Sequence, residues 1–253
     1  MERPCVCISG STQGIGRGIA EAFAHSGARL VINSHLPDDS AARELSRLTE
    51  CHFVCADLST VEGARYFVRE AHARLGRLDT LVNNAGSFRD SDFADLDQKR
   101  FDDTFNLNVR GYLFAAQTFA ELVRPDQTGA SIICVGSTNS LAAEKNSVIY
   151  DASKGAVLML IRSLAVTLAA RGIRVNGIGP GIVRTPLTEG GLSAPGVETA
   201  LTSQIPLGRI GQPVDIGGAA VFLASPGAGY ITGQMLYIDG GILANQMTWE
   251  VRT

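Results

Sequence analysis

Seven short apolar segments recur along the chain, and their spacing restricts the fold more than any other feature of the sequence. Each is separated from the next by a stretch long enough for a crossover helix, and most are apolar throughout. Continuous apolarity is typical of strands buried on both faces, as in parallel sheets covered by helices. The segments are residues 4–9, 28–33, 52–56, 79–83, 131–136, 173–178 and 234–238. We therefore expect an α/β fold with a doubly wound, seven-stranded parallel sheet flanked by helices.

The chain reads as one unit. No linker rich in proline, glycine or serine divides its 253 residues, so we expect a single domain over residues 1–253. Residues 1–135 would bind a cofactor, and residues 136–253 would supply catalytic and substrate-binding groups. The helical segments 111–123 and 152–170 are apolar on several faces, which favours self-association.

Charge and composition argue against several partners. The 22 Lys and Arg against 25 Asp and Glu give a net charge of -3, with no basic block to neutralise a nucleic-acid backbone. No apolar run reaches the roughly 20 residues that span a bilayer, and the N-terminus shows no signal-peptide pattern. We expect a cytoplasmic protein that binds neither nucleic acid nor membrane. The five cysteines lie in apolar runs and should be reduced and buried, and no Cys/His spacing predicts a metal site.

A glycine-rich turn, SGSTQGIG, joins the first apolar segment to the first helical pattern. Gly10, Gly14 and Gly16 would let the backbone approach the pyrophosphate of a dinucleotide, whose charge the helix N-terminus attracts. The spacing differs from the commoner dinucleotide fingerprint. A tight turn that only packs helix on strand is the alternative interpretation.

Further motifs, in order along the chain, resemble those of the short-chain dehydrogenase/reductase family. Residues 83–86 are similar to its NNAG motif, residues 150–154 to its YxxxK motif and residues 180–185 to its PGxxxT motif. Ser137 precedes the tyrosine by 13 residues, as the catalytic serine of the family does, and Asn108 matches its catalytic asparagine. The resemblance implies a Rossmann-type sheet, an NAD(P)-dependent oxidoreductase acting on CH–OH groups, and a homotetramer.

The glycine turn and the resemblance together predict the cofactor site. The expected contacts of the dinucleotide are Gly10, Thr12, Gln13, Gly14, Ile15, Gly16, Ser34, His35, Asp57, Leu58, Asn84, Ala85, Gly86, Tyr150, Lys154, Pro180, Gly181, Val183 and Thr185. Asp57 could instead be a carboxylate at a helix N-terminus. His35 could be a solvated loop residue.

The end of the second strand decides between NAD and NADP. An acid there would accept hydrogen bonds from the ribose 2′-hydroxyl and repel a 2′-phosphate. Ser34 occupies that place and His35 follows it. Without an acid, and with Ser34, His35 and Asn33 able to donate hydrogen bonds, we favour NADP over NAD.

Four residues are expected to carry the chemistry. Tyr150 and Lys154 would share a helix face, and a nearby ammonium would lower the pKa of Tyr150, which would then move the proton on the substrate oxygen as acid or base. The resemblance implies that Lys154 also contacts the nicotinamide ribose, that Asn108 continues the proton relay and that Ser137 orients the substrate oxygen. A turn-capping role is the alternative for Ser137. GSTNS offers no nucleophile elbow for a serine hydrolase.

The substrate is expected to contact Ser137, Asn139 and Tyr150. Polar residues in 139–146 favour a sugar or polyol, although a solvated loop would carry the same residues. PLGRIGQPVDIGGAAVFLAS and YITGQMLYIDGG are similar to stretches of bacterial sugar or polyol dehydrogenases and of 3-oxoacyl-thioester reductases, so the second activity stays an alternative. A non-catalytic dinucleotide sensor is the alternative of another class. Residues 187–204 are expected to form a lid, and Trp249 to pack at an interface.

Overall fold

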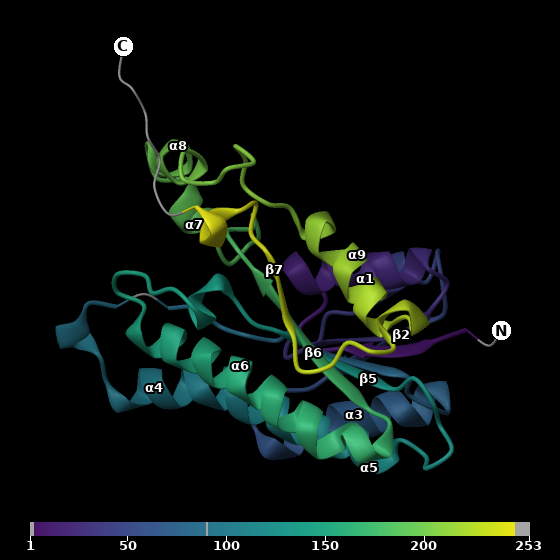
Figure 1. The fold of residues 1–253 in the computed structure, drawn as a ribbon. Coiled ribbons are helices and arrows are strands. Elements are labelled where there is room, and N and C mark those ends of the chain that lie inside the picture. The colour runs from purple at the N-terminus through teal and green to yellow at the C-terminus, as the bar shows by residue number, and fades with distance from the viewer. Residues whose placement is uncertain (1–2, 90, 246–253) are drawn as a thin grey trace.

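A computed structural model describes residues 3–89 and 91–245 (Figure 1). Within them, seven strands pair in parallel in the order β3-β2-β1-β4-β5-β6-β7. They are β1 (Cys5–Ile8), β2 (Arg29–Ser34), β3 (Cys51–Cys55), β4 (Thr80–Asn83), β5 (Ser131–Val135), β6 (Arg174–Pro180) and β7 (Met235–Ile238). The predicted doubly wound sheet is confirmed, and each strand ends within two residues of its predicted bounds. Trp249 lies outside the described residues.

Helices cover both faces of the sheet (Figure 1). One layer holds α1 (Gly14–His25), α2 (Ser40–Leu45) and α9 (Pro213–Ala224), and the other holds α3 (Val61–Leu75), α5 (Gly111–Leu122) and α6 (Val148–Leu168). The shorter elements are α4 (Gln98–Phe105), α7 (Glu189–Leu192), α8 (Val197–Thr202), a π-helical turn (Asn106–Arg110) and the 3-10 turns Phe93–Asp95, Thr138–Ser140, Ala169–Arg171, Pro226–Ala228 and Ile242–Ala244. The predicted lid segment therefore contains two short helices.

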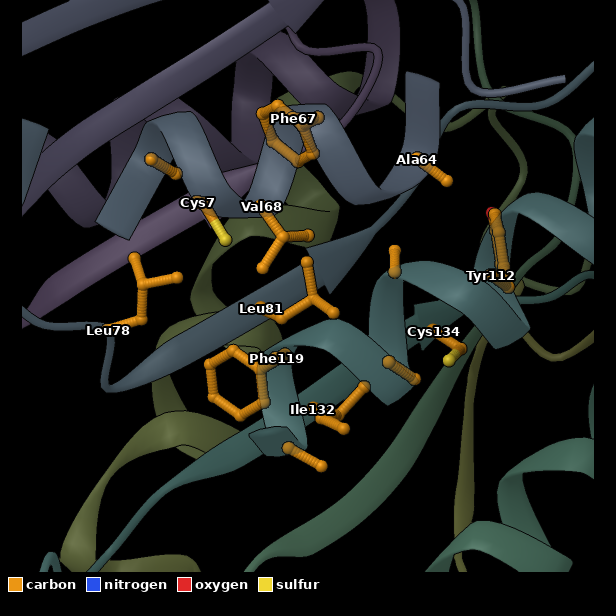
Figure 2. Packing of buried hydrophobic residues seen from close by; sticks show 14 of the residues in the cluster. Cys7, Ala64, Phe67, Val68, Leu78, Leu81, Tyr112, Phe119, Ile132 and Cys134 are labelled. Atoms are coloured by element: carbon orange, nitrogen blue, oxygen red, sulfur yellow. The ribbon is translucent and has the colours of Figure 1, made fainter. Parts of the chain in front are cut away.

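The core lies in two apolar layers, one on each face. Figure 2 shows the layer beneath α3 and α5, where Phe67 of α3, Phe119 of α5 and Leu81 of β4 are fully buried. Each such side chain contributes about 1.5–3 kcal/mol by leaving water. Because the strands are covered on both faces, this burial explains why their sequences are apolar at successive positions. The five cysteines are free, but Cys55 is exposed, so the prediction that all of them are buried is wrong.

Helix α6 is the longest helix of the described chain. The stretch Val148–Arg171 is long and apolar enough to cross a membrane by length and composition, although only 39% of its apolar window is buried here. The prediction that no stretch is long and apolar enough to span a bilayer is therefore wrong when length and composition alone are considered. However, α6 packs against β6 and carries Tyr150 and Lys154 on its first turns, so the absence of membrane binding stays a prediction.

Helices α1 and α9 pack through glycines, which gives a matched pair of stability predictions. A Cβ on Gly217 would lie 2.6 Å from the Cβ of Ala22 and 2.7 Å from the carbonyl oxygen of Gly18, whereas a Cβ on Gly218 meets nothing within 4 Å. We expect Gly217→Ala to lower the free energy of unfolding by about 1–3 kcal/mol through overpacking. Gly218→Ala should raise it by about 0.5–1 kcal/mol, because alanine restricts the unfolded chain and favours helix. Urea unfolding of both variants measures the difference, and equal shifts would contradict the close packing.

Candidate active site

A cavity of about 1080 Å³ lies at the carboxyl ends of the strands. Segments that follow β1 to β6 line it, together with parts of α6, α7 and α8. This edge of an open α/β sheet is where ligands bind. Every residue predicted to contact the dinucleotide lines the cavity. The fold therefore brings these residues together, while their contact with the dinucleotide stays a prediction.

Two asparagines hold the glycine turn. The Oδ1 of Asn33 accepts the Gly10 N–H at 3.0 Å, and the Nδ2 of Asn84 donates to the Gly10 carbonyl at 2.8 Å. Gly10 has a φ of +58°, and a Cβ on Gly16 would lie 2.4 Å from the Nδ2 of Asn84, so both positions require glycine. Asn33 is buried, and its Nδ2 donates to the carbonyls of Ser34, Val54 and Ala56. The expectation that Asn33 could donate to a 2′-phosphate is therefore wrong.

The first turn of α1 fits a pyrophosphate. No side chain caps its N-terminus at Gln13, and no acidic residue stands in the first turn. Gly14, Ile15 and Gly16 line the cavity there, so the N–H groups and the positive end of the helix dipole suit an anion. The residues present thus fit a dinucleotide. The turn after β1 has no room for side chains at Gly10 and Gly16, and the N-terminus of α1 beside it has no side-chain cap.

The end of β3 offers a carboxylate to the cavity. Asp57 lines the cavity, and its Oδ1 accepts the Ser59 N–H at 2.9 Å. The N-cap of α3 is Thr60, whose hydroxyl accepts the Gly63 N–H. The alternative in which Asp57 caps this helix is therefore wrong, and its position is compatible with the predicted cofactor contact.

The end of β2 holds the groups that should meet the ribose 2′ position. Ser34 Oγ accepts the Leu36 N–H at 3.1 Å, which leaves its proton for another acceptor, and His35 is exposed on the cavity. The sequence argument missed Asp38, which lines the same cavity and accepts the Ser40 N–H. That hydrogen bond lowers the pKa of Asp38. The premise that the cavity holds no acid after β2 is therefore wrong.

Tyr150 and Lys154 lie on adjacent turns of α6, as predicted. The Nζ of Lys154 donates to the Val135 carbonyl at 3.0 Å and lies 5.5 Å from the centroid of the Tyr150 ring. Burial lowers the pKa of Lys154 to about 8 and raises the pKa of Tyr150 to about 12, although a hydrogen bond with Ser137 lowers the pKa of Tyr150 in part. Burial is the largest effect on the pKa of Tyr150 and raises it, so the prediction that the Lys154 ammonium lowers this pKa is wrong. Phe88 packs edge-on against Tyr150 with centroids 4.8 Å apart.

Asn108 lies on the π-helical turn between α4 and α5 and is fully buried. Its Oδ1 accepts the Ser87 N–H, and its Nδ2 donates to the Ser87 carbonyl and to Ser153 Oγ. The side chain therefore ties the loop after β4 to α6 directly beside Lys154. It does not line the cavity, and its part in a proton relay stays a prediction.

Ser137 and Asn139 form the floor of the cavity after β5. Ser137 Oγ donates to Asn139 Oδ1 at 3.0 Å and accepts the Asn139 N–H at 3.1 Å. Asn139 Nδ2 donates to Asp151 Oδ1 at 2.7 Å. Ser137 thus caps a turn and lines the cavity at once, and its role in orienting the substrate oxygen stays a prediction. The amide of Asn139 is already used, which makes a direct substrate contact by it less favourable than expected.

Helices α7 and α8 cover one side of the cavity. Leu192, Val197 and Leu201 line it, and Arg184 joins the two helices through ion pairs with Glu189 at 3.0 Å and Glu198 at 2.6 Å. The segment has the position of a lid, and its closure stays a prediction. Several other lining residues were not identified from the sequence. Most of them follow the carboxyl end of a strand, and that position was the signal that could have identified them. They include Leu36, Ser59, Ser87, Phe88, Asp103 and Asn106.

In residues 3–89 and 91–245, no group of three or more His, Cys, Asp or Glu side chains could hold a metal ion. The prediction that the protein needs no metal remains a prediction.

Comparison with known proteins decides the family. The family described as enoyl-(acyl carrier protein) reductase matches residues 10–243. An L-rhamnose 1-dehydrogenase (NAD(P)(+)) of Azotobacter vinelandii is 34% identical over 247 residues, which cover 95% of this chain and 96% of that protein. The chain belongs to the short-chain dehydrogenase/reductase family. This confirms the resemblance that the motifs indicated.

Two further relatives of this short-chain dehydrogenase/reductase widen the comparison. The galactitol 2-dehydrogenase (L-tagatose-forming) of Cereibacter sphaeroides is 36% identical over 245 residues, or 95% of each chain. The crystal structure of a 3-oxoacyl-[acyl-carrier protein] reductase from Brucella melitensis in complex with NAD has a TM-score of 0.92 at 29% identity, covering 98% of this chain and 100% of that chain. The protein is an oxidoreductase that acts on CH–OH groups with NADP or NAD.

The proton side of this reaction is predicted to fall to the chain's own residues. When bound, the dinucleotide supplies or accepts the hydride. Tyr150 is neutral at pH 7 because its pKa is about 12, so it can protonate a substrate oxygen during carbonyl reduction. Lys154 is buried beside Tyr150, which lines the cavity and is open to a substrate there.

Proposed function

We propose that this short-chain dehydrogenase/reductase interconverts a secondary alcohol and a carbonyl group on a neutral sugar or polyol, with NADP preferred over NAD. The observation that carries the proposal is one cavity that joins Tyr150, Ser137 and Lys154 to the glycine turn after β1. Tyr150 would move the proton, Ser137 would orient the reacting oxygen, and Lys154 would contact the nicotinamide ribose. The names of the L-rhamnose and galactitol dehydrogenases support the substrate class.

A 3-oxoacyl-thioester reductase is the second candidate, favoured by the family description and by the Brucella melitensis relative. A partner such as an acidic carrier protein would need free basic side chains at the cavity mouth. However, Arg184 pairs with Glu189 and Glu198, and Arg89 lies 3.7 Å from Asp103. These pairs neutralise Arg184 and Arg89, so the sugar or polyol is preferred.

A substrate panel tests the proposal. We would follow reduced-nicotinamide absorbance with L-rhamnose, galactitol, other sugars and polyols, and 3-oxoacyl thioesters, each in both directions with NAD and NADP. Turnover of one sugar or polyol at least tenfold above the acyl thioesters is the expected result. Faster acyl-thioester reduction would overturn the substrate proposal. Dinucleotide binding without any turnover would favour the dinucleotide sensor.

Asp38 and Ser34, near the end of β2, should determine the ratio of kcat/KM with NADP to kcat/KM with NAD. Asp38→Asn removes a charge that would repel a 2′-phosphate, so this ratio should rise about tenfold. Ser34→Asp places a carboxylate at the strand end and should lower the ratio by about 100-fold. Steady-state kinetics with both dinucleotides measure the two shifts. A ratio that stays constant in both variants would show that the 2′ position lies elsewhere.

The assembly and location of the protein belong to the same proposal. We propose a homotetramer, because Val166, Met159 and Leu113 on α5 and α6 are 82%, 56% and 39% exposed and would gain by burial. Sedimentation should give four times the chain mass of 26.7 kDa. A cytoplasmic location, free of membrane and nucleic acid, is supported by five unpaired cysteines and the net charge of -3.

A further inference from the structure

The side chain of Tyr237, on β7, crosses the neighbouring strand β6. Tyr237 pairs with Gly179 in the register of these two strands. A Cβ on Gly179 would lie 2.5 Å and 2.6 Å from two carbon atoms of the Tyr237 ring, which is closer than carbon atoms pack. The ring therefore lies directly over the glycine, and a strand position of this kind has no room for a larger residue.

Beyond β6, the hydroxyl group of Tyr237 meets Ser140, in the turn Thr138–Ser140 that follows β5. The two hydroxyl oxygens lie 2.9 Å apart. Ser140 Oγ donates its single proton to the Ser137 carbonyl at 2.8 Å, so toward Tyr237 it can only accept. The hydrogen bonds therefore run in one direction, from Tyr237 through Ser140 to Ser137. Tyr237 and Ser140 are half-buried, and neither lines the cavity.

The backbone around Ser137 is held on both sides. Its carbonyl accepts the Ser140 N–H at 3.1 Å in addition to the Ser140 hydroxyl. The residue before it, Gly136, donates its N–H to the Ile178 carbonyl of β6 at 2.7 Å. Because the strand before Ser137 and the peptide group after it are both anchored, the direction of its Cα–Cβ bond is set. That direction places the Ser137 hydroxyl in the cavity, where it is hydrogen-bonded to Tyr150.

We propose that Tyr237 is a positioning residue for Ser137. Acting through Ser140, its hydroxyl group holds the Ser137 side chain within reach of Tyr150 and of the reacting oxygen. Tyr237 itself moves no proton to or from the substrate, because its hydroxyl group is bonded to Ser140 outside the cavity. Its effect on the reaction is therefore geometric. This inference rests on the proposed alcohol and carbonyl chemistry.

A double-mutant cycle on kcat/KM tests the proposal. Tyr237→Phe removes only the hydroxyl group and keeps the ring over Gly179. We expect it to lower kcat/KM about 5- to 10-fold, because a catalytic group that is held less precisely loses part of its effect. The substrate is the panel compound with the highest turnover, whether a sugar, a polyol or an acyl thioester. In a Ser140→Ala or a Ser137→Ala background, Tyr237→Phe should change kcat/KM less than twofold. An undiminished loss in either background would place the effect of Tyr237 outside this chain of bonds and overturn the proposal.

The titration of Tyr150 tests the proposal without a substrate. Burial raises the pKa of Tyr150 to about 12, and the hydrogen bond with Ser137 lowers it in part. If Tyr237→Phe lets Ser137 move away, this pKa should rise by about half a unit, whereas a site opened to water would lower it. The carboxylates of Glu144 and Asp151, which also raise this pKa, are unchanged in the variant.

Tyrosinate absorbance immediately after a jump to high pH measures this change. The signal of each protein is taken as the difference from its Tyr150→Phe counterpart, which removes the contribution of the other tyrosines. Ser140→Ala should raise the pKa of Tyr150 as Tyr237→Phe does. A fall, no change, or the same rise in a Ser137→Ala background would contradict the positioning role, even if no compound of the panel is turned over.

Two controls separate this inference from the broader function. The dissociation constant of NADP, measured by protein fluorescence, should change less than twofold in Tyr237→Phe, because Tyr237 lies outside the cavity. A much weaker affinity would show that the whole cavity is disturbed and would count against a local effect. Tyr230→Phe is the matched control, because this exposed tyrosine precedes β7 in the chain. It should leave both kcat/KM and the pKa of Tyr150 unchanged, and a loss equal to that of Tyr237→Phe would refute the specific role of Tyr237.

Discussion

Tyr150→Phe is expected to lower kcat/KM about 1000-fold while dinucleotide affinity stays within twofold. Positioned proton transfer contributes roughly 100- to 10 000-fold in enzymes, and phenylalanine removes only the group that moves the proton. The ring keeps its edge-on contact with Phe88, so the fold should persist. Initial rates and equilibrium binding of NADP measure the two effects.

The same variant separates an enzyme from a dinucleotide sensor. A sensor would keep its cellular function in Tyr150→Phe, because binding is preserved. Tyr112 offers a matched control on α5: it is fully buried and donates to the Val135 carbonyl, and it does not line the cavity. Tyr112→Phe should change the free energy of unfolding, and it should not lower kcat/KM by three orders of magnitude. Equal losses of kcat/KM in both variants would argue against proton transfer by Tyr150.

Lys154→Met is expected to abolish most activity and to remove a pH-dependent contribution to stability. The pKa of Lys154 is about 8 in the folded chain, against 10.5 for a solvated lysine. Between these values the unfolded chain binds the extra proton, so the free energy of unfolding contributed by Lys154 rises with pH from about 8 to 10.5. At 1.36 kcal/mol per unit the rise is about 3 kcal/mol. Below pH 8 the buried lysine is a net cost.

Other groups titrate in the same range, so the difference between wild type and Lys154→Met is the quantity to measure. Burial raises the pKa values of Cys51 and Cys134 to about 12, and these thiols should lose stability as pH rises above 9. Cys51 contributes equally in both proteins and cancels. The charge of Lys154 lowers the pKa of Cys134, but that pKa is still about 12, so up to pH 10 the contribution of Cys134 changes little between the two proteins. Urea unfolding at pH 7, 8, 9 and 10 should show Lys154→Met as the more stable protein at pH 7, with its advantage shrinking as pH rises. A constant difference would contradict the low pKa of Lys154.

The fold was largely predictable because its determinants are local in the sequence. Strands buried on both faces must be apolar throughout, and the turn after β1 requires glycine where Gly16 meets Asn84. The motifs likewise placed Tyr150, Lys154 and Ser137 at one sheet edge, since the carboxyl ends of parallel strands meet there. Sequence reasoning therefore succeeded where the pattern of apolar residues identifies a strand and where the geometry of the sheet determines the position of a residue.

The failures concern partners that lie far apart in the chain. The use of the Asn33 amide by the glycine turn, and the place of Asp38 on the cavity, depend on how loops close in space. The pKa of Tyr150 depends on the burial of its surroundings, which a four-residue spacing to Lys154 does not reveal. In each case the sequence predicted the right residue type, while long-range packing determined what that residue does.

The position of β1 between β2 and β4 in the sheet has a consequence for how the chain folds during synthesis. Of the seven strands, β1 leaves the ribosome first, and β2 covers one of its edges early, but the other edge pairs only with β4. Until Thr80–Asn83 emerges, that apolar edge has no partner and could pair with another nascent chain. Because the late pairing spans much of the first half of the chain, folding should be slow and sensitive to the speed of translation through residues 30–80. Conditions that slow synthesis there should increase aggregation more than conditions that slow it after β5.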